Sequence, residues 1–428
     1  MRAPAQAPES VLDDLAGMRG VFGRDAARRT VALLERLQRA RFRDAAGLIR
    51  FHDLVLYLRA FPQSPPVLRL ADEILFTIHE RVAKVDEDPF DDTEVSGIAG
   101  TTISTNFSFP AAKSLILRHG RAISIDWENY EHSDRLGAVL SQLVPESRED
   151  FAISAHPDAR RWFAKLSGGL KTLVTKVEPR VYDLLELPLR WNLGTSAAAR
   201  SRTRIPKREI FYHKGPFLRR KDISLEAGFR EPRLRVTRLT ARASRKVLDL
   251  ILDTSAVRYR ELYGFTNPDA THVQHADLGR GVDFYFFGVP RDRQLIRAYH
   301  AGMYFKNGVP IGYVELLTRD GVMEVGFNLY YAFRESETAW LYARLLKIFH
   351  ERLGAKSFWI DPYQIGHENQ EAIDSGAYWF YRKLGFESVS PKLRILSASE
   401  EGKLTQPGYR TSPATLRRLA EAGLLYRV

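Results

Sequence analysis

Two Asx-Gly pairs divide the stretch from Ala298 to Phe333 into three runs, and no other feature constrains the fold of this chain as strongly. Asn307-Gly308 and Asp320-Gly321 are pairs that favour the tight turns of β-hairpins. The runs that they separate are rich in aromatic and β-branched residues, which is typical of strands. The sequence therefore predicts three consecutive strands, over "AYHAGMYFKNG", "VPIGYVELLTRDG" and "VMEVGFNLYYAF".

Helical and strand patterns continue on both sides of these three runs. The expected elements are a strand over 234–239, two helices over 241–265, a helix over 335–354, a strand over 356–361, a helix over 375–386 and closing strands over 386–390 and 392–399. An antiparallel meander that leads into a β-α-β-α-β tail predicts an α/β fold, with a mixed sheet and helices on both faces.

The first two hundred residues are mostly helical by pattern. Val31, Leu33, Leu34 and Leu37 form an apolar stripe at helical spacing, and similar stripes recur up to "RVYDLLELPLRW". Only "AISIDW" is strand-like in this half. We therefore expect a mostly helical domain over 1–200, a basic connecting segment over 201–231 and the mixed-sheet domain over 232–428.

The excess positive charge of the chain lies in one segment. The net charge is +12, and the stretch from Gly194 to Lys246 holds 16 Lys and Arg against 4 Asp and Glu. Such a segment can attract an anionic partner such as nucleic acid. The alternative is a solvated connection followed by the exposed faces of a strand and a helix.

The composition also narrows the setting of the protein. Cysteine is absent, which excludes disulfides and thiolate sites and suits a reducing cytoplasm. The first thirty residues carry charges every few positions, and no apolar run approaches the roughly 18 residues of a membrane span. His367-Glu368 lacks a second histidine at helical spacing, so no metal site is expected. We expect a soluble, cytoplasmic protein.

The stretch "SGAYWFYRKLGF" carries a resemblance to a known family. Its residues match the form Asn-x-x-Ala-x-x-x-Tyr-x-Lys-x-Gly-Phe, with aspartate in place of asparagine, at Asp374, Ala377, Tyr381, Lys383, Gly385 and Phe386. Together with the element order, this motif resembles the GNAT family of N-acetyltransferases over roughly residues 232–400. The whole chain also resembles a group of bacterial proteins, and that second resemblance implies no activity.

The GNAT resemblance implies acyl-CoA, by default acetyl-CoA, as cofactor. The family's pyrophosphate loop matches Arg334 to Ala339, with Glu337 where the family has glycine. Backbone N–H groups at a helix start bind phosphates, and a carboxylate there would repel them. Alternatively, Ser336 caps the helix and Glu337 favours its positive end. The implied cofactor-binding residues are Asn328, Leu329, Tyr330, Arg334, Ser336, Glu337, Thr338, Ala339 and Asp374, in a site that is either intact or degenerate.

Three side chains are candidates for the chemistry of acyl transfer. Tyr381 matches the tyrosine that acts as the acid in many family members, although it can equally be a packing residue. Glu324 shares a strand face with Gly326 and Asn328, and Glu315 lies on the neighbouring strand. Either carboxylate can act as the base that takes a proton from the amine, or form a salt-bridged surface.

Two functions follow from these observations. The first is an acyl-CoA-dependent N-acyltransferase that uses a small-molecule or peptide amine as acceptor. The second is a non-enzymatic protein of the same fold that binds an anionic partner, such as nucleic acid, through the basic 194–246 segment. Because fold alone does not determine activity, the two are separated by the geometry of the site.

Overall fold

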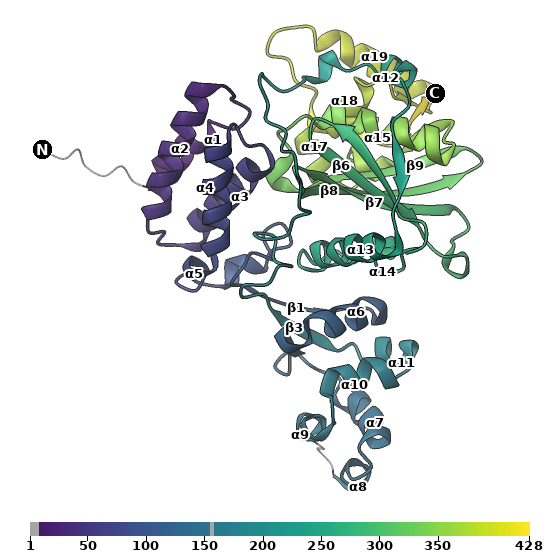
Figure 1. The fold of residues 1–428 in the computed structure, drawn as a ribbon. Helices are drawn as coiled ribbons and strands as arrows, with labels where there is room; N and C mark the ends of the chain where they lie inside the picture. The colour runs from purple at the N-terminus through teal and green to yellow at the C-terminus, as the bar shows by residue number, and fades with distance from the viewer. Residues whose placement is uncertain (1–7, 155–157) are drawn as a thin grey trace, which may run out of the picture.

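The computed structural model describes residues 8–154 and 158–428, and these form three parts (Figure 1). A helical lobe spans residues 8–91, a small-sheet lobe spans residues 102–192, and a sheet domain spans residues 225–427. Figure 1 shows the helical lobe beside the sheet domain and the small-sheet lobe beneath it. The N-terminal half, expected to be one mostly helical domain, thus contains two separate lobes.

The helical lobe follows the predicted apolar stripes. Its elements are α1 (Pro8–Ala16), α2 (Arg24–Arg39), α3 (Ala45–Ala60), α4 (Pro65–Thr77), α5 (His79–Val82) and the 3-10 turn η1 (Asp88–Asp91). Leu33, Leu34 and Leu37 of α2 are buried, as their spacing predicts. α3 is buried on almost all sides, and the carboxylate of Asp44 caps its start by accepting from the Gly47 N–H at 2.8 Å.

The small-sheet lobe contains two strands that the sequence pattern did not indicate. Its strands are β1 (Thr102–Asn106), β2 (Ile123–Ile125) and β3 (Pro188–Asn192), and its helices are α6 (Phe109–His119), α7 (Ser133–Leu143), α8 (Ser147–Ile153), α9 (Ala159–Lys165), α10 (Gly169–Lys176) and α11 (Pro179–Leu184). The strand expected at "AISIDW" is β2, whereas β3 was expected to be helical. β3 is central, between β1 and β2, and alternates buried Leu189 and Trp191 with exposed Arg190. Five residues are too few to distinguish this alternation from a helical stripe.

In the sheet domain, nine strands lie in the order β11-β12-β10-β9-β8-β7-β6-β5-β4. The strands are β4 (Val236–Arg238), β5 (Gln274–Gly279), β6 (Val282–Gly288), β7 (Ala298–Lys306), β8 (Val309–Arg319), β9 (Val322–Leu329), β10 (Ser357–Ile360), β11 (Glu387–Ser388) and β12 (Leu424–Arg427). All neighbours pair antiparallel except β9 and β10, which are parallel. The predicted mixed α/β sheet is therefore confirmed.

Helices cover both faces of this sheet, as expected (Figure 1). They are α12 (Leu225–Arg230), α13 (Ala241–Ala256), α14 (Tyr263–Thr266), α15 (Thr338–Leu353), α16 (Pro362–Ile365), α17 (Gln370–Ser375), α18 (Ala377–Arg382), α19 (Pro391–Lys403) and α20 (Pro413–Leu419). α13 and α14 lie on the face toward the small-sheet lobe, and α15 and α18 lie on the opposite face. In the described ranges, no helix has both the length and the apolar character needed to cross a bilayer.

The three predicted strands pair as two consecutive hairpins. β7 pairs with β8 across Asn307-Gly308, and β8 pairs with β9 across Asp320-Gly321. Both residues of each pair have positive φ, at 49° and 81° for the first and 52° and 79° for the second. Positive φ at both central residues defines the type I′ turn, which explains why Asx-Gly predicted the hairpins.

The expected closing strand over 392–399 is wrong. These residues belong to α19, which begins at Pro391 and buries Leu393 and Ser397 on one face, while Ile395 is 74% exposed. Proline at the first helical position favours a helix start. The sheet is closed instead by β12, at the very end of the chain, which pairs with both β10 and β11.

The first residues of the basic 194–246 segment are buried, which differs from both interpretations of it, an anion-binding surface and a solvated connection. Arg200, Ser201 and Thr203 are buried. The Arg200 Nη1 donates to the Glu94 carbonyl at 2.7 Å, and the Ser201 carbonyl accepts from the Arg59 guanidinium at 2.9 Å. Some of the basic side chains of this segment therefore donate hydrogen bonds inside the protein and do not contribute to a basic surface.

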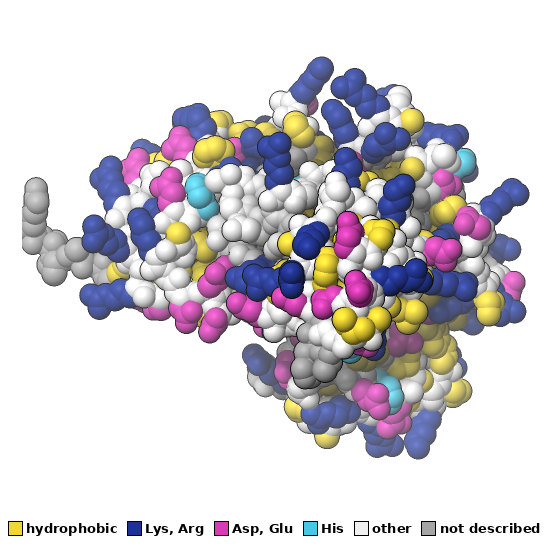
Figure 2. Space-filling view, turned by 90° about the horizontal axis from the view of Figure 1, so that it is seen from below, with side chains coloured by type: hydrophobic (Ala, Val, Ile, Leu, Met, Phe, Trp, Pro, Cys, Tyr) yellow, Lys and Arg dark blue, Asp and Glu magenta, His cyan; other side chains and the backbone are white. Residues whose placement is uncertain are grey.

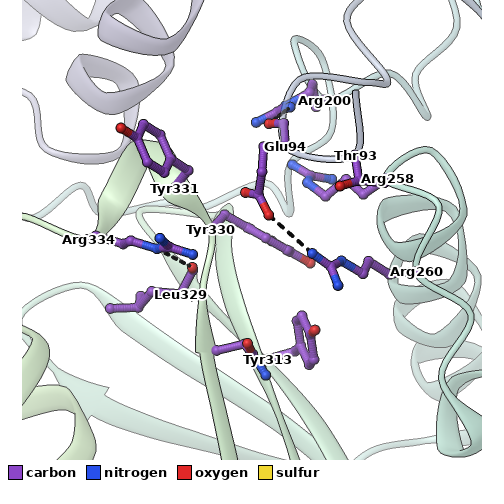
Figure 3. A pocket seen from close by; sticks show the side chains of 11 residues that line it. Thr93, Glu94, Arg200, Arg258, Arg260, Tyr313, Leu329, Tyr330, Tyr331 and Arg334 are labelled. Carbon is purple, nitrogen blue, oxygen red and sulfur yellow. Dashed lines mark hydrogen bonds and ion pairs between the residues drawn. The ribbon is translucent and has the colours of Figure 1, made fainter. Parts of the chain in front are cut away.

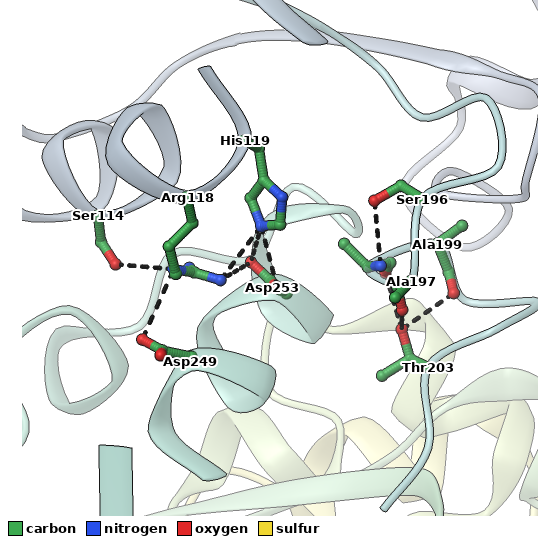
Figure 4. A network of polar contacts seen from close by, with 10 residues as sticks. Ser114, Arg118, His119, Ser196, Ala197, Ala199, Thr203, Asp249 and Asp253 are labelled. Atoms are coloured by element: carbon green, nitrogen blue, oxygen red, sulfur yellow. Dashed lines mark hydrogen bonds and ion pairs between the residues drawn. The ribbon is translucent and has the colours of Figure 1, made fainter. Parts of the chain in front are cut away.

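A polar contact joins the small-sheet lobe to the sheet domain (Figure 4). Arg118 of α6 donates to Asp253 of α13 at 2.7 Å, and His119 lies 3.1 Å from the same carboxylate. Asp249, one turn earlier on α13, lies 3.5 Å from Arg118. These contacts hold α6 against α13. The residues that follow α13 in the chain belong to the candidate site.

Candidate functional site

The sheet opens between β9 and β10. The two strands pair over Val322 to Glu324 only, and β10 ends at Ile360 while β9 continues to Leu329. Among the described residues, the outer edge of β9 from Val325 to Leu329 therefore has no strand partner. α15 begins at Thr338, shortly beyond this end of β9, so a helix start follows the opening along the chain.

The predicted backbone donors at the end of β9 point in two directions. The Tyr330 N–H donates to the Ile311 carbonyl of β8 at 3.0 Å, and the Asn328 carbonyl accepts from the Tyr304 hydroxyl. Because successive residues of a strand point their backbone groups to opposite sides, the Leu329 N–H points away from β8. Of the three residues, Leu329 thus directs its N–H toward the opening.

Glu337 is turned into the protein and paired with a cation. Its carboxylate accepts from the Arg280 guanidinium at 2.7 Å and 2.5 Å and from the Leu218 N–H at 2.9 Å. The side chain is 5% exposed. The expected repulsion of phosphates is therefore offset by Arg280. The expected cap at Ser336 is wrong, because the N-cap of α15 is Glu337 and no side chain caps it.

The remaining residues of the expected cofactor loop lie around the start of α15. Thr338 Oγ1 donates to the Arg334 carbonyl at 3.1 Å, and Ala339 is buried in the first turn of the helix. Arg334 is ion-paired with Glu371 of α17. The first N–H groups of a helix have no intrahelical acceptor, so the first turn of α15 offers donors to an anion.

Asp374 is not brought to this loop by any contact in the described chain. It lies on α17 and accepts from the Gln370 side chain, one turn earlier, at 2.6 Å. The helix expected over 375–386 is α18, which begins just after Gly376, whose φ is 68°. The left-handed conformation at Gly376 separates α17 from α18, so Asp374 and Tyr381 lie on different helices.

Tyr381 is a packed residue on the α15 face of the sheet. It is 5% exposed, and its ring contacts those of Tyr342, Phe380 and Phe386. Burial raises the pKa of Tyr381 well above its ordinary value. The phenol is therefore neutral at physiological pH and keeps its proton for donation.

The two predicted carboxylates lie on the opposite face of the sheet. Phe327 packs on Tyr342 of α15, so its strand neighbour Gly326 and the paired Glu315 face α13 and α14. Glu315 accepts a hydrogen bond from the Tyr299 hydroxyl, and burial raises the pKa of Glu315. Glu324 is ion-paired with Arg297. A ligand that contacts both Tyr381 and Glu315 has to pass through the opening between β9 and β10.

Four arginines surround a small cavity that the sequence reasoning missed (Figure 3). The cavity has a volume of about 30 Å³ and is lined by Arg200, Arg258, Arg260, Arg334, Thr93, Glu94, Tyr313, Asn328, Leu329, Tyr330 and Tyr331. It includes the predicted Asn328, Leu329, Tyr330 and Arg334, together with residues from distant parts of the chain. The sequence pattern gave no signal for this cavity, because Arg258 lies just after α13, which ends at Ala256.

A buried lysine borders Glu337 on the side of the helical lobe. Lys306 is 1% exposed, and its Nζ donates to the Arg280 carbonyl at 2.5 Å and contacts the His213 Nε2 at 2.9 Å. Burial lowers the pKa of Lys306 to about 7, and burial together with Lys306 and Arg280 lowers that of His213 to about 3.

The depressed pKa of Lys306 predicts that the protein becomes more stable between about pH 7 and pH 9. In this window the unfolded lysine, with an ordinary pKa of 10.5, is protonated, while the folded one loses its proton. The unfolded state then binds more protons, so the free energy of unfolding rises by up to about 1.4 kcal/mol per pH unit. Urea unfolding across this range measures it. The slope should be lost in Lys306→Met and kept in the exposed control Lys392→Met, and an unchanged slope in Lys306→Met would contradict the assignment.

Comparison with known proteins does not supply a family for this chain. No family model matches it, and neither a curated protein nor a solved structure matches it. A function is therefore argued from three features of the site, which are the opening between β9 and β10, the start of α15 and the arginine-lined cavity.

Proposed function

We propose that the protein is an acyl-CoA-dependent N-acyltransferase, with the sheet domain as its catalytic part. The observation that carries the proposal is the opening between parallel β9 and β10, followed along the chain by the start of α15. An opening between strands admits an extended thioester arm, and a helix start binds phosphate groups. The stretch from Tyr381 to Phe386 resembles the GNAT motif, and this resemblance supports the same function.

Residues of β8, β9 and α18 have the chemistry that acyl transfer requires. Acyl-CoA, when bound, supplies a thioester carbonyl for an amine to attack. In this proposal the Leu329 N–H holds the carbonyl oxygen as negative charge develops on it. Glu315, with a raised pKa, takes the proton of the amine directly or through a water, and the neutral Tyr381 hydroxyl donates a proton to the departing sulfur.

Release of free thiol from acetyl-CoA tests the proposed activity. Because the chain has no cysteine, a thiol-reactive dye reports the product without background from the protein. We expect thiol release that depends on an added amine, measured over a panel of small amines and peptides. Absence of amine-dependent release over the whole panel would count against the proposal.

A second candidate is binding of nucleic acid through the basic segment. Six cationic side chains remain exposed near β4 and the start of α13, namely Arg233, Arg235, Arg238, Arg242, Arg245 and Lys246. On the face seen in Figure 2, however, basic and acidic side chains are interspersed rather than gathered in one basic surface. Binding that falls steeply with salt would favour this candidate, and no binding at low salt would exclude it.

A further inference from the structure

Arg258 is a buried cation that lacks a carboxylate partner. It is 3% exposed and lies just after α13, where its Nη1 donates to the Thr254 carbonyl at 2.7 Å. Within the described chain, its Nε has no hydrogen-bond partner, and no carboxylate lies within ion-pair distance. Its guanidinium stacks over the Tyr330 ring at 4.2 Å. Burying a charge without an opposite charge is costly, so this arrangement calls for an anion.

A second buried guanidinium borders the same cavity. Arg200 is 2% exposed, and its closest carboxylate is Asp53, at 3.8 Å from Nη2. Asp53 is itself bonded to the His52 ring at 2.9 Å. Of these two buried cations, only Arg200 has a carboxylate within ion-pair distance, and that carboxylate lies at the limit of ion pairing and is already engaged.

The other charged groups at the rim leave the cavity positive. Arg260 is paired with Glu94 at 3.1 Å, and Arg334 is paired with Glu371 outside the cavity. Figure 3 shows Arg200, Arg258 and Arg260 on one side of Tyr330 and Arg334 on the other. Glu94 is the one carboxylate among the lining residues, against four guanidinium groups. The cavity is thus suited to an added negative charge.

Size and geometry favour a carboxylate over a larger anion. A cavity of about 30 Å³ holds roughly two water-sized groups, which corresponds to the two oxygens of a carboxylate rather than to the four of a phosphate. The planar fork of a guanidinium binds two oxygens of a carboxylate or of a phosphate, and the carboxylate is the smaller of these two groups. The bound group is therefore expected to be planar and to carry one charge.

We propose that this cavity holds the carboxylate of the acceptor, so that the acceptor is an amino acid; this inference rests on the proposed acyltransferase function. Asn328 and Leu329, at the end of β9, line both the cavity and the opening. Tyr313, on the same wall, lies two residues from Glu315 on one face of β8, a distance of about 7 Å along the strand. A carboxylate held by Arg258 thus places the amine of the same molecule between the opening and the proposed base.

Calorimetric titration without acyl-CoA tests the cavity directly. The probes are glycine, L-alanine and L-glutamate, each compared with the corresponding α-amide, and inorganic phosphate. We expect the amino acids to bind and the amides and phosphate not to bind. In Arg258→Met, which removes an unpaired buried cation, the affinity should fall at least about tenfold. The exposed control Arg319→Met should bind like the wild type.

A second variant keeps the test decisive if Arg258→Met fails to fold. The side chain of Arg260 is 44% exposed, so Arg260→Gln should fold normally and still weaken amino-acid binding several-fold. Equal binding of amino acids and amides, binding of phosphate alone, or unchanged affinity in both variants would overturn the inference. Amino-acid binding without thiol release from acetyl-CoA would refute the acyltransferase and leave the carboxylate site standing. Thiol release that is as fast with amides as with amino acids would refute the carboxylate site and leave the acyltransferase standing.

Discussion

Replacing Glu337 with alanine is expected to lower the free energy of unfolding by about 3 kcal/mol. The carboxylate is 5% exposed and satisfies both the Arg280 guanidinium and the Leu218 N–H. Its removal leaves a half-buried cation and a backbone donor without their acceptor, and both losses cost free energy. Because the bonds to Arg280 join the start of α15 to the β5–β6 turn, the loss should also weaken any binding at that helix start.

A neighbouring glutamate provides the matched control for this stability prediction. Glu335 lies two residues away, has a side chain that is 78% exposed, and contacts Arg19 at 3.4 Å. Glu335→Ala should change the free energy of unfolding by less than about 1 kcal/mol. Urea unfolding of both variants and the wild type measures the difference. Similar values for the two variants would show that the Arg280 pair contributes little.

Replacing Glu315 with glutamine is expected to lower the rate of acyl transfer by about 10²–10⁴-fold. Glutamine keeps the size of the side chain and can still accept from the Tyr299 hydroxyl, but it cannot take a proton from the amine. The affinity for acetyl-CoA should remain that of the wild type. The wild-type rate should rise with pH through a pKa above the usual range of a glutamate, because burial raises the pKa of Glu315.

A second variant, at Glu324, tests which of the two carboxylates, Glu315 or Glu324, acts as the base. Glu324 lies on the same face of the sheet, but its carboxylate is already engaged in an ion pair with Arg297. Glu324→Gln should leave the rate within about threefold of the wild type. Amine-dependent thiol release measures both variants. If Glu324→Gln is the slower one, or if neither variant slows the reaction, Glu315 is not the base.

The elements predicted correctly from the sequence are those that a pattern within a short stretch of residues indicates. The meander is encoded by Asx-Gly turns, and α15 by one apolar stripe. β5 and β6 were not predicted, because Val282 to Phe287 is buried on both faces and shows no alternation. Their turn also places Arg280, rather than asparagine or aspartate, in the left-handed conformation, with φ of 50°.

The candidate site was only partly predictable, because its charges are paired across long distances in the chain. The sequence identified Glu337 as an obstacle to phosphate binding, but its partner Arg280 lies on another hairpin. The arginine-lined cavity draws Arg200 from the connecting segment, Arg258 from the end of α13 and Arg334 from the loop before α15. These three residues lie far apart in the chain, and only the folded structure brings them to one cavity.

Titration of acetyl-CoA into the wild-type protein, followed by calorimetry, is the most direct test of the idea that the opening between β9 and β10 holds a thioester arm. The account predicts saturable binding at one site per chain. It also predicts that Glu337→Ala, which loosens the start of α15, binds more weakly than Glu335→Ala. The absence of any heat of binding at millimolar acetyl-CoA would contradict the account.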